Sequence, residues 1–243
     1  MLNIFRQTRK HNSGNSHRRN YVFYAIGEIA LVVVGIVIAL QIDNWNNQRI
    51  ESKIEREILK ELRASLNNDL LKYQHNKQHI KQIEEKVSRL QTILTKGESS
   101  PDIDSLFGAV YGILRFEVNT ASYEELKSHG INLISDDDIR RLTVRIYDTH
   151  LKLIQHMNKI EDSVILEALR PFYLQNFTHI RFSETATAKN LEEILQDDYF
   201  LNLVDYRLTV LRSQHFNTYP QIITDMQDLA TRIDEFLEIH KEN

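Results

Sequence analysis

The sequence predicts an all-α protein in which an N-terminal transmembrane helix continues into an elongated antiparallel helical bundle. Three observations lead to this fold class. The 243 residues include only 7 Gly and 3 Pro, too few for an all-β sandwich or barrel, which needs a turn about every 8 to 12 residues. One long apolar run lies near the N-terminus, and apolar residues recur at helical spacing behind it. An apolar fraction of 42% excludes a disordered chain, and the absence of cysteine excludes disulfide frameworks and thiol catalysis.

Residues 21–42 are predicted to form an uncleaved transmembrane signal anchor. This run carries one charge and as a helix measures about 33 Å, enough for a hydrocarbon core of roughly 30 Å. No small-x-small cleavage site follows it. Tyr21 and Tyr24 at one end and Trp45 at the other would form the two aromatic belts. Residues 1–20 form a short basic tail with no acid, so the positive-inside rule places the N-terminus in the cytoplasm and residues 43–243 outside it.

Glu28 is the charged residue inside this run, and three interpretations of it stay open. It could be protonated or extend its carboxyl group toward the cytoplasmic face, it could bond to another helix, or it could belong to a proton or ion relay. Gly35 and Ala39 form a small-xxx-small pair, and Gly27 lies two turns earlier on roughly the same side. These small residues would allow close packing of a second helix.

A long stalk helix is predicted over residues 46–96. Apolar residues recur at steps of three and four from Ile50 to Leu94, and the later steps follow a heptad pattern. Gly97 is the candidate C-cap. The stretch 43–47 has low helix propensity, so a hinge at the membrane surface is an alternative to one continuous helix.

Two short helices are predicted after the stalk. Ser100 and Pro101 provide an N-cap and a first-turn proline for a helix that reaches Leu114. The second short helix covers residues 120–129 and ends at Gly130.

Two longer helices complete the predicted bundle. The acidic stretch 135–138 reads as a capping box that opens a helix over residues 136–169, although three adjacent acids could instead bind a cation. This helix is expected to stop before Pro171, and a looser stretch follows. In the last helix, residues 198–241, the apolar faces before and after Pro220 differ by one position, which predicts a kink or stutter there.

Several separate stretches of the sequence form a recognisable pattern. They are Tyr24-Ala-Ile-Gly-Glu-Ile-Ala-Leu-Val-Val-Val-Gly-Ile-Val-Ile-Ala-Leu-Gln-Ile-Asp-Asn-Trp-Asn46, Tyr123-Glu-Glu-Leu-Lys-Ser-His-Gly-Ile-Asn-Leu-Ile134, Asp138-Ile-Arg140, Tyr147 and Phe200-Leu-Asn-Leu-Val-Asp-Tyr-Arg207. Together they resemble a family of uncharacterised single-pass membrane proteins abundant in Bacteroidota, known only as a domain of unknown function. The resemblance implies a membrane anchor, a helical extracytoplasmic domain and a Gram-negative inner-membrane location, but no activity. The chain differs from the family pattern at His129 and in its shorter basic tail.

No motif for catalysis, phosphate binding or metal-dependent hydrolysis is present in the sequence. His75 and His79 are spaced to bind one metal ion, but the sequence indicates no third ligand, so a solvated polar face is the better interpretation. We therefore expect no cofactor, no metal and no enzymatic activity.

The densest polar cluster in the family-like motif is a candidate contact for a ligand or partner. It comprises Tyr123, Glu124, Glu125 and Lys127. The alternative is that the two acids and the lysine only complement the dipole of a short helix.

The leading hypothesis is a non-enzymatic interaction or scaffold module on the periplasmic face of a bacterial inner membrane. Its partners would be the lipid bilayer and a protein, or a second copy, bound through the membrane helix and stalk. Nucleic acid is disfavoured because residues 44–243 hold 25 Lys and Arg against 32 Asp and Glu, a net charge of −7. The alternative is an accessory subunit of a transport or ion-conducting complex that uses Glu28 to contact partner helices.

Overall fold

The computed structural model describes the backbone of residues 15–240 and the side chains of residues 26–240. The all-α prediction is confirmed, with one two-stranded hairpin as the β structure of the described part. The chain divides into two compact units, Met1–Ile54 and Glu55–Asn243. Most of the predicted basic tail, and the side chains of Tyr21 and Tyr24, lie outside the described residues.

The described part of the first unit is the beginning of helix α1 (Asn15–Lys96). The helix is uninterrupted over residues 43–47, so the hinge that low helix propensity allowed there is absent. Eleven large apolar side chains between Ile26 and Ile42 are exposed, from 49% at Val37 to 76% at Leu31. This is the one helix of the described chain that is long and apolar enough to cross a membrane.

In the second unit, α1 packs its apolar seam into the bundle. Side chains at steps of three and four are buried along this face. The helix ends in a Schellman turn, in which Glu98 N donates to Ile93 O at 3.1 Å and Gly97 adopts a φ of 65°. The buried seam comprises Ile58, Leu62, Leu66, Leu70, Tyr73, Ile80, Ile83, Val87, Leu90 and Leu94.

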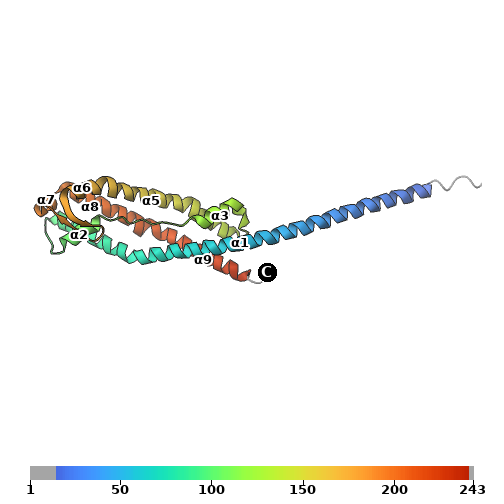
Figure 1. Ribbon diagram of the computed structural model, residues 1–243, viewed down its shortest axis with the longest axis horizontal. Helices are drawn as coiled ribbons and strands as arrows, with labels where there is room; N and C mark the ends of the chain where they lie inside the picture. Colours follow the sequence, from blue (N-terminus) through green and yellow to red (C-terminus); the bar gives the residue numbers. More distant parts are fainter. Residues whose placement is uncertain (1–14, 241–243) are drawn as a thin grey trace, which may run out of the picture. The chain divides into compact units, whose positions relative to one another are not determined.

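Two further long helical stretches complete this unit (Figure 1). Residues 198–239 run antiparallel to α1, because Gln91 bonds to Asp205 near one end and Arg63 to Asp234 near the other. The first stretch consists of α4 (Asp137–Val144), η2 (Arg145–His150), α5 (Leu151–Ser163), η3 (Val164–Leu169) and α6 (Arg170–Asn176). The second consists of α8 (Asp198–Leu211), η4 (Arg212–Thr218) and α9 (Tyr219–Ile239).

The segments η2, η3 and η4 are π-helical turns within these long helices. A π-helical turn contains one residue more than an α-helix of the same span, so it shifts the apolar face by one position. The one-position shift that the sequence shows near Pro220 is therefore accommodated by η4, immediately before α9. The chain stays helical through Pro220.

The predicted helix end at Pro171 is wrong, because the chain stays helical as far as Asn176. Pro171 lies in the first turn of α6, directly after η3. A proline has no backbone N–H and would break the i to i−4 hydrogen bond of a regular α-helix. The wider π-helical turn changes this hydrogen-bond pattern, so the missing N–H of Pro171 is tolerated. The looser stretch is correspondingly shorter and contains the antiparallel strands β1 (Phe177–Arg181) and β2 (Thr185–Ala188).

The hairpin and the short helices α2 (Ile103–Val110) and α7 (Leu191–Leu195) cover one end of the bundle, whereas α3 (Ala121–His129) lies toward the other end (Figure 1). Phe177 pairs with Ala188 across the hairpin, and its ring packs at 5.0 Å on that of Phe107. Helix α2 approaches β2 so closely that a Cβ on Gly108 would lie 2.1 Å from the backbone nitrogen of Thr185. The short elements of this unit are α2 (Ile103–Val110), α3 (Ala121–His129), η1 (Ile131–Leu133) and α7 (Leu191–Leu195).

Helix α2 ends at Val110, so the predicted extension to Leu114 is wrong. Residues 112–117 alternate between buried and exposed, as in a strand, although no strand within residues 15–240 pairs with them. The buried members include Leu114 and Phe116. We call residues 112–120 the inserted segment.

Candidate functional site

The membrane-helix residues singled out from sequence lie on an open helix surface. Glu28 and Ala39 are exposed, and Glu28 has no partner among the described side chains. A Cβ on Gly27 or Gly35 would meet nothing within 4 Å. Trp45 is also exposed. This surface has room for lipid or for a second helix.

The cluster predicted around Tyr123 is divided between the core and the surface. The Tyr123 side chain is buried and stacks on Tyr147 with ring centroids 4.7 Å apart. Burial, a hydrogen bond with Asp148 and the nearby acidic charges raise the pKa of Tyr123 to about 12. Lys127 Nζ lies 5.5 Å from the Tyr123 ring centroid and 3.4 Å from a Glu124 carboxylate oxygen. Tyr123 is therefore a packing residue.

The three charged members of that cluster remain on the surface. Glu124, Glu125 and Lys127 are exposed along α3. The exposed pair between Glu124 and Lys127 fits the expected stabilisation of a short helix, worth about 0.2–0.5 kcal/mol. These charges are accessible to a partner.

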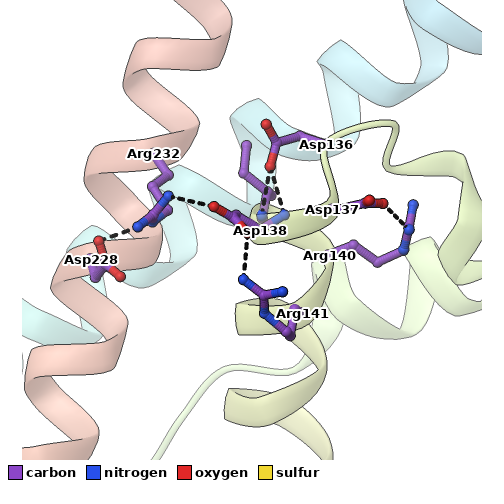
Figure 2. Close-up of polar contacts among 8 residues, drawn as sticks. Asp136, Asp137, Asp138, Arg140, Arg141, Asp228 and Arg232 are labelled. Atoms are coloured by element: carbon purple, nitrogen blue, oxygen red, sulfur yellow. Dashed lines mark hydrogen bonds and ion pairs between the residues drawn. The ribbon is translucent and has the colours of Figure 1, made fainter.

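The acidic residues of the stretch 135–138 cap the start of α4 and form ion pairs there (Figure 2). The N-cap is Asp136, which accepts hydrogen bonds from Asp138 N at 2.9 Å and Ile139 N at 2.8 Å. The capping-box prediction placed the cap one residue early, at Ser135. Ser135 instead donates its backbone N–H and hydroxyl to Glu55 of α1, at 2.7 and 2.8 Å. Because Glu55 is buried, this contact ties α1 to the start of α4.

Arginines neutralise the other two acids of this stretch. Asp137 pairs with Arg140, and Asp138 pairs with Arg141 (Figure 2). Arg232 of α9 lies 3.1 Å from both Asp138 and Asp228, so the network crosses from α4 to α9. The stretch is thus a helix start with exposed ion pairs, each worth about 0–1 kcal/mol.

The inserted segment explains a set of buried polar residues that sequence reasoning missed. A backbone segment without strand partners must bond its N–H and C=O groups to side chains when it is buried. Leu114 N donates to Glu161 at 3.0 Å, and Asn119 N donates to Asp69 at 2.8 Å. Leu114 O lies 3.2 Å from His215 Nε2.

Two further side chains bond to carbonyl groups of the same segment. Arg207 donates to Gly112 O at 2.7 Å, and Asn158 donates to Phe116 O at 2.8 Å. Glu161 and Arg207 also pair with each other, and both are fully buried. Partners on α1, α5, α8 and η4 thus hold the inserted segment inside the bundle. The alternation of apolar and charged residues from Leu114 to Val118 is the sequence signal that could have identified it.

Burial shifts the titration of the groups around this segment. It raises the pKa of Asp69, which is 1% exposed, and a hydrogen bond from Asn119 and the charge of Lys72 oppose this shift only in part. Burial, reinforced by the Asp69 charge, also raises the pKa of Tyr147. The hydroxyl groups of Tyr147, Ser65 and Thr143 have no hydrogen-bond partner among the described residues. We expect internal water molecules to bond to these hydroxyl groups.

A histidine–carboxylate pair links η2 to α9. His150 Nε2 lies 2.8 Å from Asp225 Oδ2, and Gln221 donates to the same carboxylate at 3.1 Å. Burial opposes ionisation of Asp225, but these hydrogen bonds hold its pKa below the usual value. Within residues 26–240 no group of three or more His, Asp and Glu could hold a metal ion, and His75 and His79 are exposed on α1.

The chain was compared with known protein families, curated proteins and solved structures. A family model described as a family of unknown function, DUF6090, matches residues 28–210. The chain belongs to DUF6090. The DUF6090 match includes the apolar part of α1 from Glu28 onward, the inserted segment and α8 as far as Val210. No curated protein and no solved structure matches the chain.

Proposed function

We propose that this DUF6090 protein is a membrane-anchored helical interaction module and not an enzyme. In this proposal the anchor lies in a bacterial inner membrane, the N-terminus is cytoplasmic, and the bundle binds a protein partner in the periplasm. The supporting observation is the exposed apolar surface of α1 between residues 26 and 42.

The size of this surface favours a membrane. Eleven large apolar side chains there are each about half or more exposed. Full burial of such a side chain contributes about 1.5–3 kcal/mol, so removing this surface from water would contribute on the order of 10 kcal/mol or more. A bilayer supplies that environment along the whole length of the segment.

A partner-binding role is supported by aromatic side chains on the bundle surface. Tyr199 and Tyr206 are 58% and 52% exposed and lie seven residues apart on one face of α8. Phe182, in the β-hairpin, is 66% exposed. Aromatic residues are enriched in protein interfaces and uncommon on free surfaces.

The anchor is tested by fractionating cells that express the full chain. We expect the protein to stay in the membrane pellet after an alkaline wash, and Val33→Asp with Ile36→Asp to release it. A C-terminal alkaline phosphatase fusion should be active, because this enzyme matures in the periplasm. Release of the unaltered chain by the wash, or an inactive fusion, would contradict the proposal.

The partner is tested by photocrosslinking in cells. A photoreactive residue is placed at Tyr199 or Tyr206, and the matched controls carry it at Lys152 or Lys159, which are exposed on α5. Specific crosslinked products at the tyrosine positions support the module. Equal products at all four positions would count against it.

The second candidate function is an accessory subunit that uses Glu28. It is favoured because Glu28 lies within the apolar part of α1 without a partner among the described side chains, and burying an ionised carboxylate in a bilayer costs about 2.5–3.5 kcal/mol or more. Glu28→Gln should then abolish copurification of a membrane partner, whereas Asp43→Asn should not. Unchanged copurification in Glu28→Gln would exclude this role.

A further inference from the structure

A cavity of about 440 Å³ lies between α1 and the η4–α9 stretch, within the second unit. Its apolar lining includes Ile80, Phe216 and Ile223. Lys77 and Lys81, one turn apart on α1, line it with exposed side chains. Pockets of roughly 300–1,000 Å³ with an apolar lining and a few polar groups are typical small-molecule sites.

The charges at this cavity are positive. None of the residues that line it is acidic. Lys77 forms no ion pair with any residue that the structure describes, and Lys81 lies 3.7 Å from Glu85 in an exposed pair. Two cations thus converge on an apolar cavity in a region whose overall charge is negative, since residues 44–243 carry −7. This arrangement favours an anionic ligand.

His215 adds a buried polar group to the lining. It is 5% exposed, and its Nε2 faces Leu114 O, which only accepts hydrogen bonds, so Nε2 carries the proton. Burial lowers the pKa of His215 to about 4, so the ring is neutral at pH 7 and Nδ1 is an acceptor. Nδ1 has no donor among the described residues. An unpartnered buried acceptor is costly, and a bound water that donates to Nδ1 would satisfy it.

We propose that this cavity binds a small amphipathic anion. A carboxylate or phosphate group pairs with Lys77 and Lys81, and the apolar part of the ligand packs on Ile80, Phe216 and Ile223. The site is independent of the partner surface on α8 and of the anchor.

The test uses the full chain in phosphatidylcholine nanodiscs with 4-phenylbutyrate as the carboxylate probe and phenethyl phosphate as the phosphate probe. Binding is followed by saturation-transfer NMR, with empty nanodiscs as the blank and 4-phenylbutan-1-ol as the neutral analogue. We expect saturable binding of at least one anion and weaker binding of the alcohol. Whichever anion binds more tightly identifies the head group.

Two variants locate the site. The double change Lys77→Gln with Lys81→Gln removes two charge-assisted contacts and should weaken binding about tenfold or more. The matched control, Lys152→Gln with Lys159→Gln, makes the same charge change on α5 and should bind as the unaltered chain does. Thr224→Phe places a ring at the cavity lining and should block binding without changing any charge.

Three results would overturn the proposal. The first is that neither anion gives a saturable signal above that of empty nanodiscs. The second is that the alcohol binds as tightly as the anions. The third is that the Lys77 and Lys81 double variant binds the anion with the same affinity as its control variant. Circular dichroism of each variant establishes that it is folded. If Thr224→Phe does not fold, the lysine variants alone decide. Membrane fractionation and crosslinking are unaffected by these outcomes, so failure of the ligand site leaves the interaction module standing.

Discussion

Replacing Arg207 with Met is expected to destabilise the bundle by about 3–5 kcal/mol, because it leaves a buried carboxylate without its cation. Arg207 and Glu161 are both fully buried. The change also removes the hydrogen-bond donor to Gly112 O, while Leu114 N still donates to Glu161. For a domain of this size, about 2–4 °C is lost per kcal/mol, so the midpoint should fall by about 6–20 °C.

The assay is thermal unfolding of the full chain in nanodiscs, followed by circular dichroism. A double-mutant cycle separates the ion pair from simple packing. Glu161→Met alone should also cost about 3–5 kcal/mol, but the double variant should cost at least about 2 kcal/mol less than the sum of the two, because no charge then remains buried without a partner.

The matched control is an exposed pair. Lys60 lies 3.0 Å from Glu57, with side chains 58% and 62% exposed, and Lys60→Met should change stability by less than about 1 kcal/mol. If Arg207→Met shifts the midpoint no more than this control does, or if the cycle is additive, the buried pair does not hold the inserted segment in place.

Three further predictions follow from individual contacts. Burial lowers the pKa of His215 to about 4, so the stabilising contribution of the neutral ring should be complete above a pH of about 6.5 and lost as the pH falls toward 4. His215→Phe should flatten this part of the stability–pH curve, and an unchanged curve would refute this prediction. Gly108→Ala should destabilise by about 1–3 kcal/mol or more in urea unfolding, since its Cβ would lie 2.1 Å from Thr185 N, and a neutral result would show that α2 can move away from β2. Glu55→Ala should cost about 1–3 kcal/mol because it leaves the buried contact of Ser135 unmade, and faster amide exchange at Ser135 would locate the loss.

The long helices were predictable because their apolar residues repeat at helical spacing. The seam from Ile58 to Leu94 is buried, and the one-position shift near Pro220 corresponds to a real change in helix geometry. The end predicted at Pro171 was wrong because propensity rules assume a regular α-helix, in which a proline breaks the pairing, and the chain forms η3 there instead.

The inserted segment and its polar partners were not predictable from helical spacing. Arg207 lies on the apolar face of α8, between residues that pack in the core. An arginine is expected at the protein surface unless a buried partner for its charge is known. That partner, Glu161, lies 46 residues away in the chain. Buried polar pairs between distant segments leave no periodic signal. The apolar spacing therefore assigned the first residues of the inserted segment, as far as Leu114, to the preceding helix.

The π-helical turns also bear on how chain length varies among relatives. Each turn contains one residue beyond what a regular α-helix needs to join the same two apolar faces. Deleting one residue within Arg212–Thr218 would therefore leave the core faces of α8 and α9 in register, and the same holds for η2 and η3. Relatives that are one residue shorter are expected to have their alignment gaps inside these helices, with the hydrophobic core unchanged.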